Sequence, residues 1–412
     1  MESVYLGREP IIDRENSLFA YEVLYKNAQK ESEANSRYTS ASVINTVLNK
    51  FGTNAIIGNR KAFVKVDEKF LMHDLIFTIP SEFFIYSLVD LELSDRVVER
   101  IFQLHQKGYE LSLDDTPLKK DVLVKYQTIL KKLSYIRVTL DDVGMSTVKL
   151  IEFLHKHGIK VVSTGIVSST EYKVAKELGC DLFQGYFFAE PKILENSKYE
   201  PSQANILQLY NLLLDDDTNI DVITQAFEDN HEVTLQLLQF INSGAFHFRN
   251  RISSINHILS LVGRIPLSQW LMLMIYSKSV SKTSGYSPLM LMVKNRTELM
   301  EKILKVVRPD ASKEFLGEAY FVGVLSLIDT VFGVELEKIL GDMKISLEVK
   351  EALIEHKGIL GEIYLLVRGI EVVDIDLMMD FEEKYSLESD VIETIVLESM
   401  QGVNEFENPS ED

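Results

Sequence analysis

Short apolar runs and longer amphipathic stretches alternate along the chain from Leu18 to about Phe188. Gly108, Gly158 and Gly179 each follow a stretch with hydrophobic residues at helical spacing, where a left-handed helix cap favours a residue without Cβ. This alternation is typical of βα units that surround a parallel sheet. The segments predicted to form its strands are Ala62–Val66, Phe83–Ser87, Tyr109–Leu113, Tyr135–Leu140, Lys160–Ser163 and Cys180–Phe183.

Two further strands are predicted before these units, over Val4–Ile11 and Leu18–Lys26. The polar stretch Asp13–Asn16 lies between them and indicates a β-hairpin. The first half of the chain is therefore predicted to be an α/β TIM-like (β/α) barrel that begins with a hairpin and departs from a simple eightfold repeat.

The strand pattern ends near a polar stretch between Pro191 and Pro201, and helical periodicity continues from Ile206 onward. We therefore predict a second domain that is entirely α-helical. The expected division is a barrel over 1–195, a linker over 196–204, a helical domain over 205–403 and an acidic tail over 404–412. The tail is polar and contains a proline, which predicts a frayed terminus.

Composition supports two domains and narrows the range of partners. A chain of 412 residues is longer than one hydrophobic core normally supports. Its net charge of −19 repels a phosphate backbone, so we expect no nucleic-acid partner. The single cysteine, Cys180, is expected to be a buried thiol. The chain shows neither a signal peptide nor an apolar run long enough to cross a bilayer, which predicts no membrane insertion and a cytoplasmic location.

Three ordered motifs stand at predicted strand ends, where the functional loops of a barrel gather. They are Glu22-Val23-Leu24, Leu113-Asp114-Asp115 and the segment from Gln184-Gly185-Tyr186 to Pro191. Together they resemble the EAL family of cyclic-di-GMP phosphodiesterases over residues 1 to 195.

The resemblance implies a reaction that this chain does not support. An active member hydrolyses cyclic-di-GMP with two divalent cations, Mg²⁺ or Mn²⁺, which need several oxygen ligands. Of the family's functional positions, this chain keeps Glu22, Asp114, Asp115 and Gln184 as a vestigial pocket. The positions that align with other family ligands or active-site groups carry Lys65, Tyr86, Arg137, Thr139, Thr164 and Val167. We therefore expect no catalytic residue, no bound metal and no cofactor.

Different roles remain open for the retained residues. Glu22 and Asp114 are expected to form internal salt bridges with Lys65 or Arg137, in preference to nucleotide binding or residual metal binding. Lys26 replaces a family Arg and could contact phosphate as a point charge.

The helical half resembles the HDOD domain, an all-α relative of the HD phosphohydrolases. The resemblance rests on Leu235–Phe246 and Ile252–Gly263, and this half contains no His-Asp dipeptide. The histidines of this half, His231, His247, His257 and His356, are expected to be surface or core residues.

The combined prediction is a non-enzymatic EAL–HDOD signalling protein that acts through protein–protein interaction, with the barrel as regulatory or docking module and HDOD as output. Its protein partner is unidentified, and a homo-oligomer is left open. The alternatives are a receptor that binds cyclic-di-GMP without hydrolysis and, less favoured, an active phosphodiesterase.

Overall fold

The computed structural model describes residues 4–27, 44, 52–89, 91–114, 118–140, 145–189, 201–230, 233–234, 237, 254–278, 287–343, 345–388 and 390–407. The chain divides into two compact units. The barrel unit comprises Met1–Glu190, Ser281–Asp310 and Leu365–Asp412, and the helical unit comprises Pro191–Val280 and Ala311–Tyr364.

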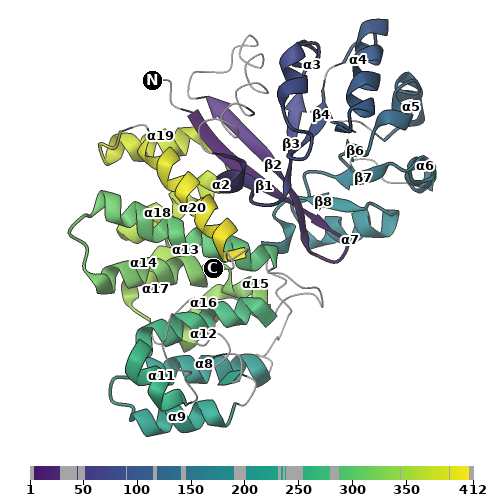
Figure 1. The fold of residues 1–412 in the computed structure, drawn as a ribbon. Coiled ribbons are helices and arrows are strands. Elements are labelled where there is room, and N and C mark those ends of the chain that lie inside the picture. Colours follow the sequence, from purple (N-terminus) through teal and green to yellow (C-terminus); the bar gives the residue numbers. More distant parts are fainter. Residues whose placement is uncertain are drawn as a thin grey trace. The chain divides into compact units, whose positions relative to one another are not determined.

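Strands β1 to β8 of the barrel unit form a closed barrel in chain order (Figure 1). Strand β1 pairs antiparallel with both β2 and β8, and the remaining neighbours are parallel. The strands are β1 (Val4–Asp13), β2 (Leu18–Asn27), β3 (Lys61–Val66), β4 (Phe84–Leu88), β5 (Glu110–Leu113), β6 (Tyr135–Val138), β7 (Lys160–Ser163) and β8 (Leu182–Gln184). The predicted (β/α) barrel and its opening hairpin are confirmed.

Local sequence signals explain where the barrel helices begin and end. The hydroxyls of Ser94 and Ser168 accept backbone N–H bonds at the starts of α4 and α7. Gly108, Gly158 and Gly179 have φ of 85°, 76° and 101°, so each predicted cap glycine has the expected left-handed backbone. The helices are α2 (Thr53–Ile57), α3 (Glu68–Leu71), α4 (Asp95–Gln106), α5 (Lys120–Lys125), α6 (Met145–Lys156) and α7 (Ser169–Leu178), with 3₁₀ turns η3 (Asp74–Thr78), η4 (Leu130–Lys132) and η5 (Phe187–Ala189).

The barrel interior contains a layer of buried apolar side chains. Because side chains alternate along a strand, these positions identify which residues face inward. The residues of this layer are Ile11, Ala20, Phe63, Ile85, Tyr135, Val162 and Leu182. The residue two positions nearer the carboxyl end of each parallel strand therefore also faces the interior.

The described part of the helical unit consists of helices, as predicted. They are α8 (Pro201–Leu213), α9 (Ile220–Glu228), α11 (Ile255–Val262), α12 (Arg264–Lys278), α14 (Lys313–Leu325), α15 (Ile328–Phe332), α16 (Leu336–Asp342) and α17 (Leu347–Ile354). Helix α18 (Gly358–Val372) begins in this unit and ends in the barrel unit.

The units differ from the predicted linear division into 1–195 and 205–403. The barrel unit also takes up α13 (Pro288–Val307), α19 (Ile375–Lys384) and α20 (Val391–Glu407). The physical reason is apolar packing, since Leu291 of α13 and Val403 of α20 share a buried cluster with Leu18 and Tyr21 of the hairpin strand β2.

The prediction that a frayed tail begins at residue 404 is wrong. Helix α20 continues to Glu407, and Asn404 is only 6% exposed. Its amide donates to the carbonyl oxygens of Asn54 and Ala55 at 2.9 and 2.8 Å. The last turn of α20 therefore supplies polar caps to α2.

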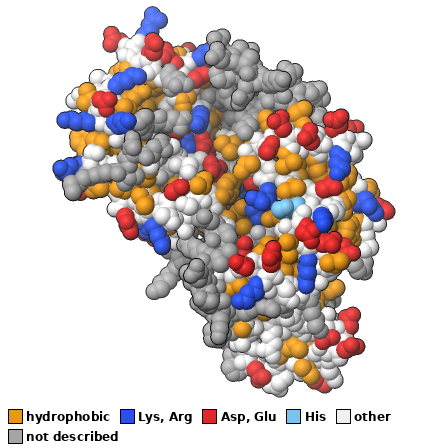
Figure 2. All heavy atoms as spheres, turned by 180° about the vertical axis from the view of Figure 1, so that it is seen from behind, with side chains coloured by type: hydrophobic (Ala, Val, Ile, Leu, Met, Phe, Trp, Pro, Cys, Tyr) orange, Lys and Arg blue, Asp and Glu red, His pale blue; other side chains and the backbone are white. Residues whose placement is uncertain are grey.

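The described part of the surface carries both positively and negatively charged side chains. Figure 2 shows Lys and Arg side chains interspersed with Asp and Glu over one face of the molecule. Among the described residues, no helix has both the length and the apolar character needed to cross a membrane.

Candidate functional site

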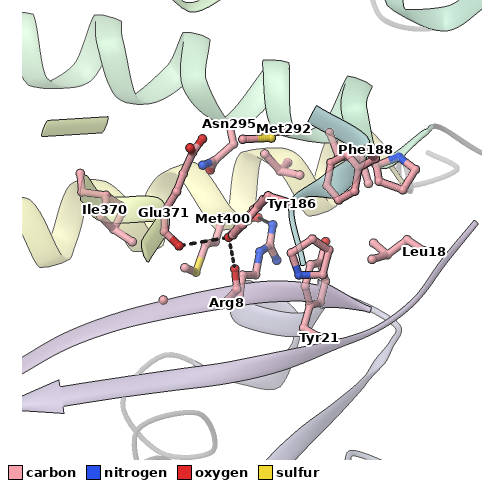
Figure 3. A pocket seen from close by; sticks show the side chains of 16 residues that line it. Arg8, Leu18, Tyr21, Tyr186, Phe188, Met292, Asn295, Ile370, Glu371 and Met400 are labelled. Carbon is pink, nitrogen blue, oxygen red and sulfur yellow. Dashed lines mark hydrogen bonds between the residues drawn. The ribbon is translucent and has the colours of Figure 1, made fainter. Parts of the chain in front are cut away.

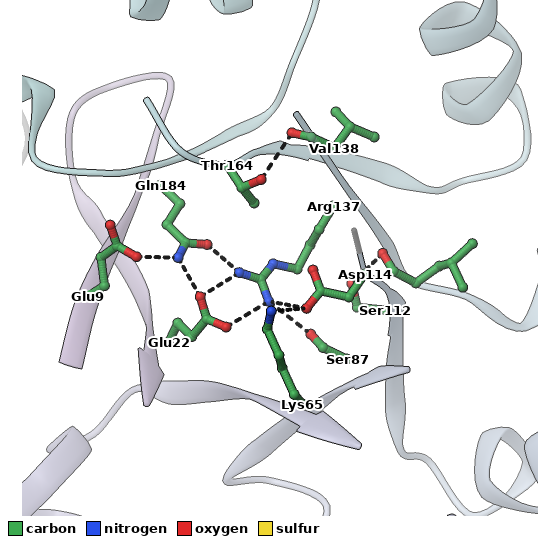
Figure 4. Close-up of polar contacts among 11 residues, drawn as sticks. Glu9, Glu22, Lys65, Ser87, Ser112, Asp114, Arg137, Val138, Thr164 and Gln184 are labelled. Atoms are coloured by element: carbon green, nitrogen blue, oxygen red, sulfur yellow. Dashed lines mark hydrogen bonds and ion pairs between the residues drawn. The ribbon is translucent and has the colours of Figure 1, made fainter. Parts of the chain in front are cut away.

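A ring of polar side chains lies inside the barrel beyond the apolar layer, towards the carboxyl ends of the parallel strands (Figure 4). Five of these residues follow a residue of the apolar layer by two positions along the chain, Glu9 precedes one by two positions on the antiparallel β1, and Asp114 comes directly after β5. We call this set the central polar network: Glu9, Glu22, Lys65, Ser87, Asp114, Arg137 and Gln184.

Arg137 of β6 is the centre of the network. Its Nη1 and Nη2 atoms donate to the two carboxylate oxygens of Glu22 at 3.1 and 2.7 Å, which makes a bidentate ion pair. Nη1 also donates to Asp114 Oδ2 at 3.0 Å and Ser87 Oγ at 3.4 Å. The guanidinium lies 5.5 Å from the centroid of the Phe63 ring in the apolar layer. Arg137 is 2% exposed, so both ion pairs are shielded from water.

Lys65 of β3 provides a second cation at Asp114 (Figure 4). Its Nζ lies 3.5 Å from Asp114 Oδ2, the same oxygen that accepts from Arg137. The Lys65 side chain is 49% exposed, whereas Asp114 is buried. One oxygen of Asp114 is therefore shared by a buried guanidinium and a half-exposed ammonium.

Gln184 closes the network on the β1 and β8 side. Its Oε1 accepts from Arg137 Nη2 at 2.5 Å, and its Nε2 donates to both Glu9 Oε2 and Glu22 Oε2 at 2.5 Å. The side-chain amide thus links the guanidinium to two carboxylates, because it has an acceptor at one atom and donors at the other.

The two glutamates have opposite pKa shifts. Burial alone would raise the pKa of Glu22, but the charge and hydrogen bonds of Arg137, with the hydrogen bond from Gln184, lower it below its ordinary value. Burial raises the pKa of Glu9, and the neighbouring Glu22 charge adds to this, while the Gln184 hydrogen bond and Arg137 oppose it. Glu22 is thus held as the charged partner of Arg137.

The prediction that Glu22 and Asp114 pair internally with Lys65 or Arg137 is confirmed. Both cations take part, and Arg137 contacts both carboxylates. Among the described residues, no group of three or more His, Cys, Asp or Glu side chains is arranged to hold a metal ion.

Tyr86 does not occupy the position predicted for it. Ile85 faces the apolar layer and Ser87 contacts Arg137, so Tyr86 between them faces the surrounding helices. Its ring stacks on Tyr109 at 5.6 Å, and burial strongly raises the pKa of its hydroxyl. Ser87, and not Tyr86, is therefore the inward group near the end of this strand.

The remaining substituted positions lie at the rim. Thr164 donates to the carbonyl oxygen of Val138 at 3.3 Å, and Thr139 is exposed. Both line a hollow of about 270 Å³ at the ends of β6 and β7. Val167 is 72% exposed, and its backbone N–H donates to Glu171 in the first turn of α7.

Some predicted site residues fall outside what the structure describes, and others were not predicted. Asp115 and the side chain of Lys26 lie outside the described residues, as do His231 and His247. Glu9 and Ser87 were not predicted from the sequence as site residues. The inward positions on β1 and β4, counted from the register of the neighbouring strands, could have identified both residues.

Two family models match the chain in succession. The EAL domain model matches residues 63–191, and the HDOD domain model matches residues 201–333. The chain has an EAL domain followed by an HDOD domain. The central polar network therefore occupies the interior of the EAL barrel, and α8 to α15 lie in the region matched by HDOD.

Two curated proteins are similar to this EAL–HDOD chain over most of their length. One is named Uncharacterized protein YuxH of Bacillus subtilis, with 27% identity over 95% of this chain and 97% of that protein. The other is named Cyclic di-GMP phosphodiesterase CdgJ of Vibrio cholerae, with 23% identity over 91% of this chain and 86% of that protein.

Solved structures with EAL domains are also similar to the chain. The Bacillus subtilis YkuI protein, in complex with substrate cyclic-di-GMP and calcium, has 14% identity over 57% of this chain and 72% of its own (TM-score 0.39). An EAL domain protein of Listeria monocytogenes has 16% identity over 45% of this chain and 87% of its own (TM-score 0.38). The two family matches, together with the curated relatives, identify the chain as an EAL–HDOD signalling protein related to cyclic-di-GMP phosphodiesterases.

Proposed function

We propose that the EAL barrel of this protein is non-catalytic and serves as a regulatory or docking module, with the HDOD domain as the output that binds a protein partner. The observation that carries this proposal is the position of Arg137. Its guanidinium lies between Glu22 and Asp114, at 2.7 and 3.0 Å from their carboxylate oxygens. These carboxylates already have a counter-ion supplied by the chain itself.

The described residues do not fit a pair of divalent cations. Mg²⁺ and Mn²⁺ need several oxygen ligands, and the carboxylates here are committed to Arg137 and Lys65. A doubly charged ion placed about 4 Å from the guanidinium would be repelled by several kcal/mol at an effective dielectric constant near 20. We therefore derive no hydrolytic step for this barrel.

Titration calorimetry of the full chain with cyclic-di-GMP, with and without Mg²⁺, tests this proposal. The expected result is no binding heat under either condition, because no metal completes the pocket and Arg137 fills its centre. Tight binding without Mg²⁺ would instead favour a receptor that binds the dinucleotide without hydrolysis. Turnover in the presence of Mg²⁺ would contradict the non-catalytic reading.

The interaction role needs a separate experiment on the intact chain. Affinity capture should use wild-type protein and a variant with a surface charge reversal on the HDOD region, with identified partners re-tested in purified form. Sedimentation of the purified chain alone checks whether a second copy is the partner. A chain that is monomeric and captures no protein reproducibly would contradict this part of the proposal.

A further inference from the structure

The barrel closes where β1 meets β8, and both strands contribute residues to the central polar network. Ile11 of β1 pairs antiparallel with Gln184 of β8. Glu9 and Gln184 point into the network. Arg8, next to Glu9, and Tyr186, two residues after Gln184, point towards helices of the same unit (Figure 3). Each strand thus links the network to the helices packed outside it.

Tyr186 connects the end of β8 to helix α18. Its hydroxyl lies 3.1 Å from the carbonyl oxygen of Glu371 and 3.3 Å from that of Arg8. The Glu371 side chain forms a bidentate ion pair with Arg296 of α13 at 2.7 and 2.9 Å. Tyr186 and Glu371 are among the residues that line an apolar cavity of about 70 Å³ (Figure 3).

Arg8 makes the matching connection from β1 to helix α20. Its Nη1 donates to Asn404 Oδ1 at 2.8 Å, and Nη2 lies 3.5 Å from the carbonyl oxygen of Met400. The guanidinium also lies over the Tyr21 ring at 4.3 Å. The residue next to Glu9 in the chain therefore contacts α20 directly.

The backbone between Gln184 and Tyr186 leaves little room for independent movement. Gly185 has φ of 137°, and a Cβ placed there would lie 2.0 Å from the carbonyl oxygen of Ile166. The Ile166 N–H in turn donates to the Gln184 carbonyl at 3.0 Å. A shift of Gln184 would therefore displace Tyr186 as well, because closely packed segments move together.

Helix α18 is one continuous helix with residues in both units, so a displacement of its barrel end can be transmitted along it. Its first turns, up to Tyr364, belong to the helical unit, and the part from Leu365 to Val372 belongs to the barrel unit. Glu371, which accepts from Tyr186, lies at the barrel end of this continuous helix.

We propose that the barrel end of helix α18 is the read-out of the central polar network, and that Gln184 and Tyr186 form the main link between them. A change that rearranges Arg137, Glu9 or Gln184 alters the hydrogen bond from Tyr186 to α18. This inference deepens the proposed function and rests on it, because it gives the non-catalytic barrel a route to influence the helical half.

Hydrogen exchange on the full chain tests the link with a double-mutant cycle between Glu9→Gln and Tyr186→Phe. Loss of the Tyr186 hydroxyl should speed exchange of residues 366–372 about fivefold, which corresponds to a hydrogen bond of about 1 kcal/mol. Glu9→Gln should also change exchange there in the wild-type background. In the Tyr186→Phe background it should have no further effect, because the link is already broken.

Two controls make the result specific. Helix α4, which has no hydrogen bond to either residue among the described contacts, should keep its exchange rate in every variant. Arg137→Lys, which keeps the charge but loses the planar fork, should act like Glu9→Gln in both backgrounds. Three results would each overturn the proposal. The two substitutions could act independently, with multiplicative effects on the exchange rate, the exchange rate of residues 366–372 could stay unchanged, or α4 could be accelerated equally. The proposed function fails by a different result, which is turnover of cyclic-di-GMP.

Discussion

At the scale of single residues, Arg137 holds the polar groups of the barrel interior together. A guanidinium presents several donors in one plane and can therefore contact Glu22, Asp114 and Gln184 at once. A single ammonium at the same position could not reproduce the bidentate contact with Glu22. Arg137 therefore makes contacts that a Lys at this position could not make.

Replacing Arg137 should destabilise the fold strongly. Arg137→Met leaves Glu22 and Asp114 buried without their main counter-ion, which typically costs about 3–5 kcal/mol. The matched control is Lys65→Met, which removes a half-exposed partner of Asp114 and should cost less than about 1 kcal/mol. Urea unfolding of both variants measures the difference. Equal effects of the two substitutions would show that the buried pairs do not stabilise the barrel.

Glu9 should make stability depend on pH in the opposite sense to Glu22. Its folded pKa is raised above 4.5, so the ionised carboxylate costs stability at neutral pH and this cost disappears as pH falls through the folded pKa. Glu9→Gln should therefore be more stable than wild type at pH 7, and the difference should shrink on acidification. Thermal midpoints across a pH series test this. A difference that is independent of pH would contradict it.

The pairing of Glu22, Asp114, Lys65 and Arg137 could be predicted from sequence, because oppositely charged residues that face the same barrel interior must neutralise one another. Glu9 and Ser87 could not be found in the same way. Their roles depend on strand register, and a one-residue shift moves a side chain to the other face of the sheet. The misplacement of Tyr86 has this cause.

At the scale of elements, the hairpin β1–β2 is covered by helices from the distant C-terminal part of the chain. The β1–β2 turn, the strands and the cap glycines follow from local pattern, so these features were predictable. The packing of α20 on α2 and β2 was not, because Asn404 and Asn54 are separated by 350 residues. A periodic pattern of hydrophobic residues cannot indicate a contact between residues so far apart in the chain.

Asn404 should be important for attaching α20. Asn404→Ala removes the side-chain donors to the Asn54 and Ala55 carbonyls and the acceptor of the Arg8 guanidinium, and each lost hydrogen bond of this kind costs about 0.5–1.5 kcal/mol. Gln401→Ala is the control, because Gln401 lies on the same helix and is exposed. Chemical denaturation should separate the two variants. Loss of stability that is no greater for Asn404→Ala than for the control would contradict the capping role.

Gly185 and Gly165 give a second matched pair. Both have positive φ, but an added Cβ at Gly185 would overlap the Ile166 carbonyl, while the space around Gly165 is open. Gly165→Ala should cost about 1–2 kcal/mol for the left-handed backbone alone. Gly185→Ala should cost about 1–3 kcal/mol more because the segment must move apart. Unfolding midpoints test this order, and the reverse order would show that the β8 turn is not tightly packed.

At the scale of the whole molecule, the two compact units do not follow one another along the chain. The EAL and HDOD motifs and the all-helical second half could be read from the sequence, because each depends on neighbouring residues. The assignment of α13, α19 and α20 to the barrel unit depends on tertiary packing and could not be read in that way. A fragment cut at residue 195 would therefore lose helices that belong to the barrel unit.

A phosphodiesterase assay on the purified chain tests directly whether the barrel is non-catalytic. Cyclic-di-GMP is incubated with the chain and either Mg²⁺ or Mn²⁺, and the opened linear dinucleotide is quantified by chromatography. We predict no product above the level of a protein-free control, because Arg137 and Lys65 neutralise the carboxylates that metals would need. If the wild-type chain forms product and Glu22→Gln abolishes it, the barrel is catalytic and the proposed function is wrong.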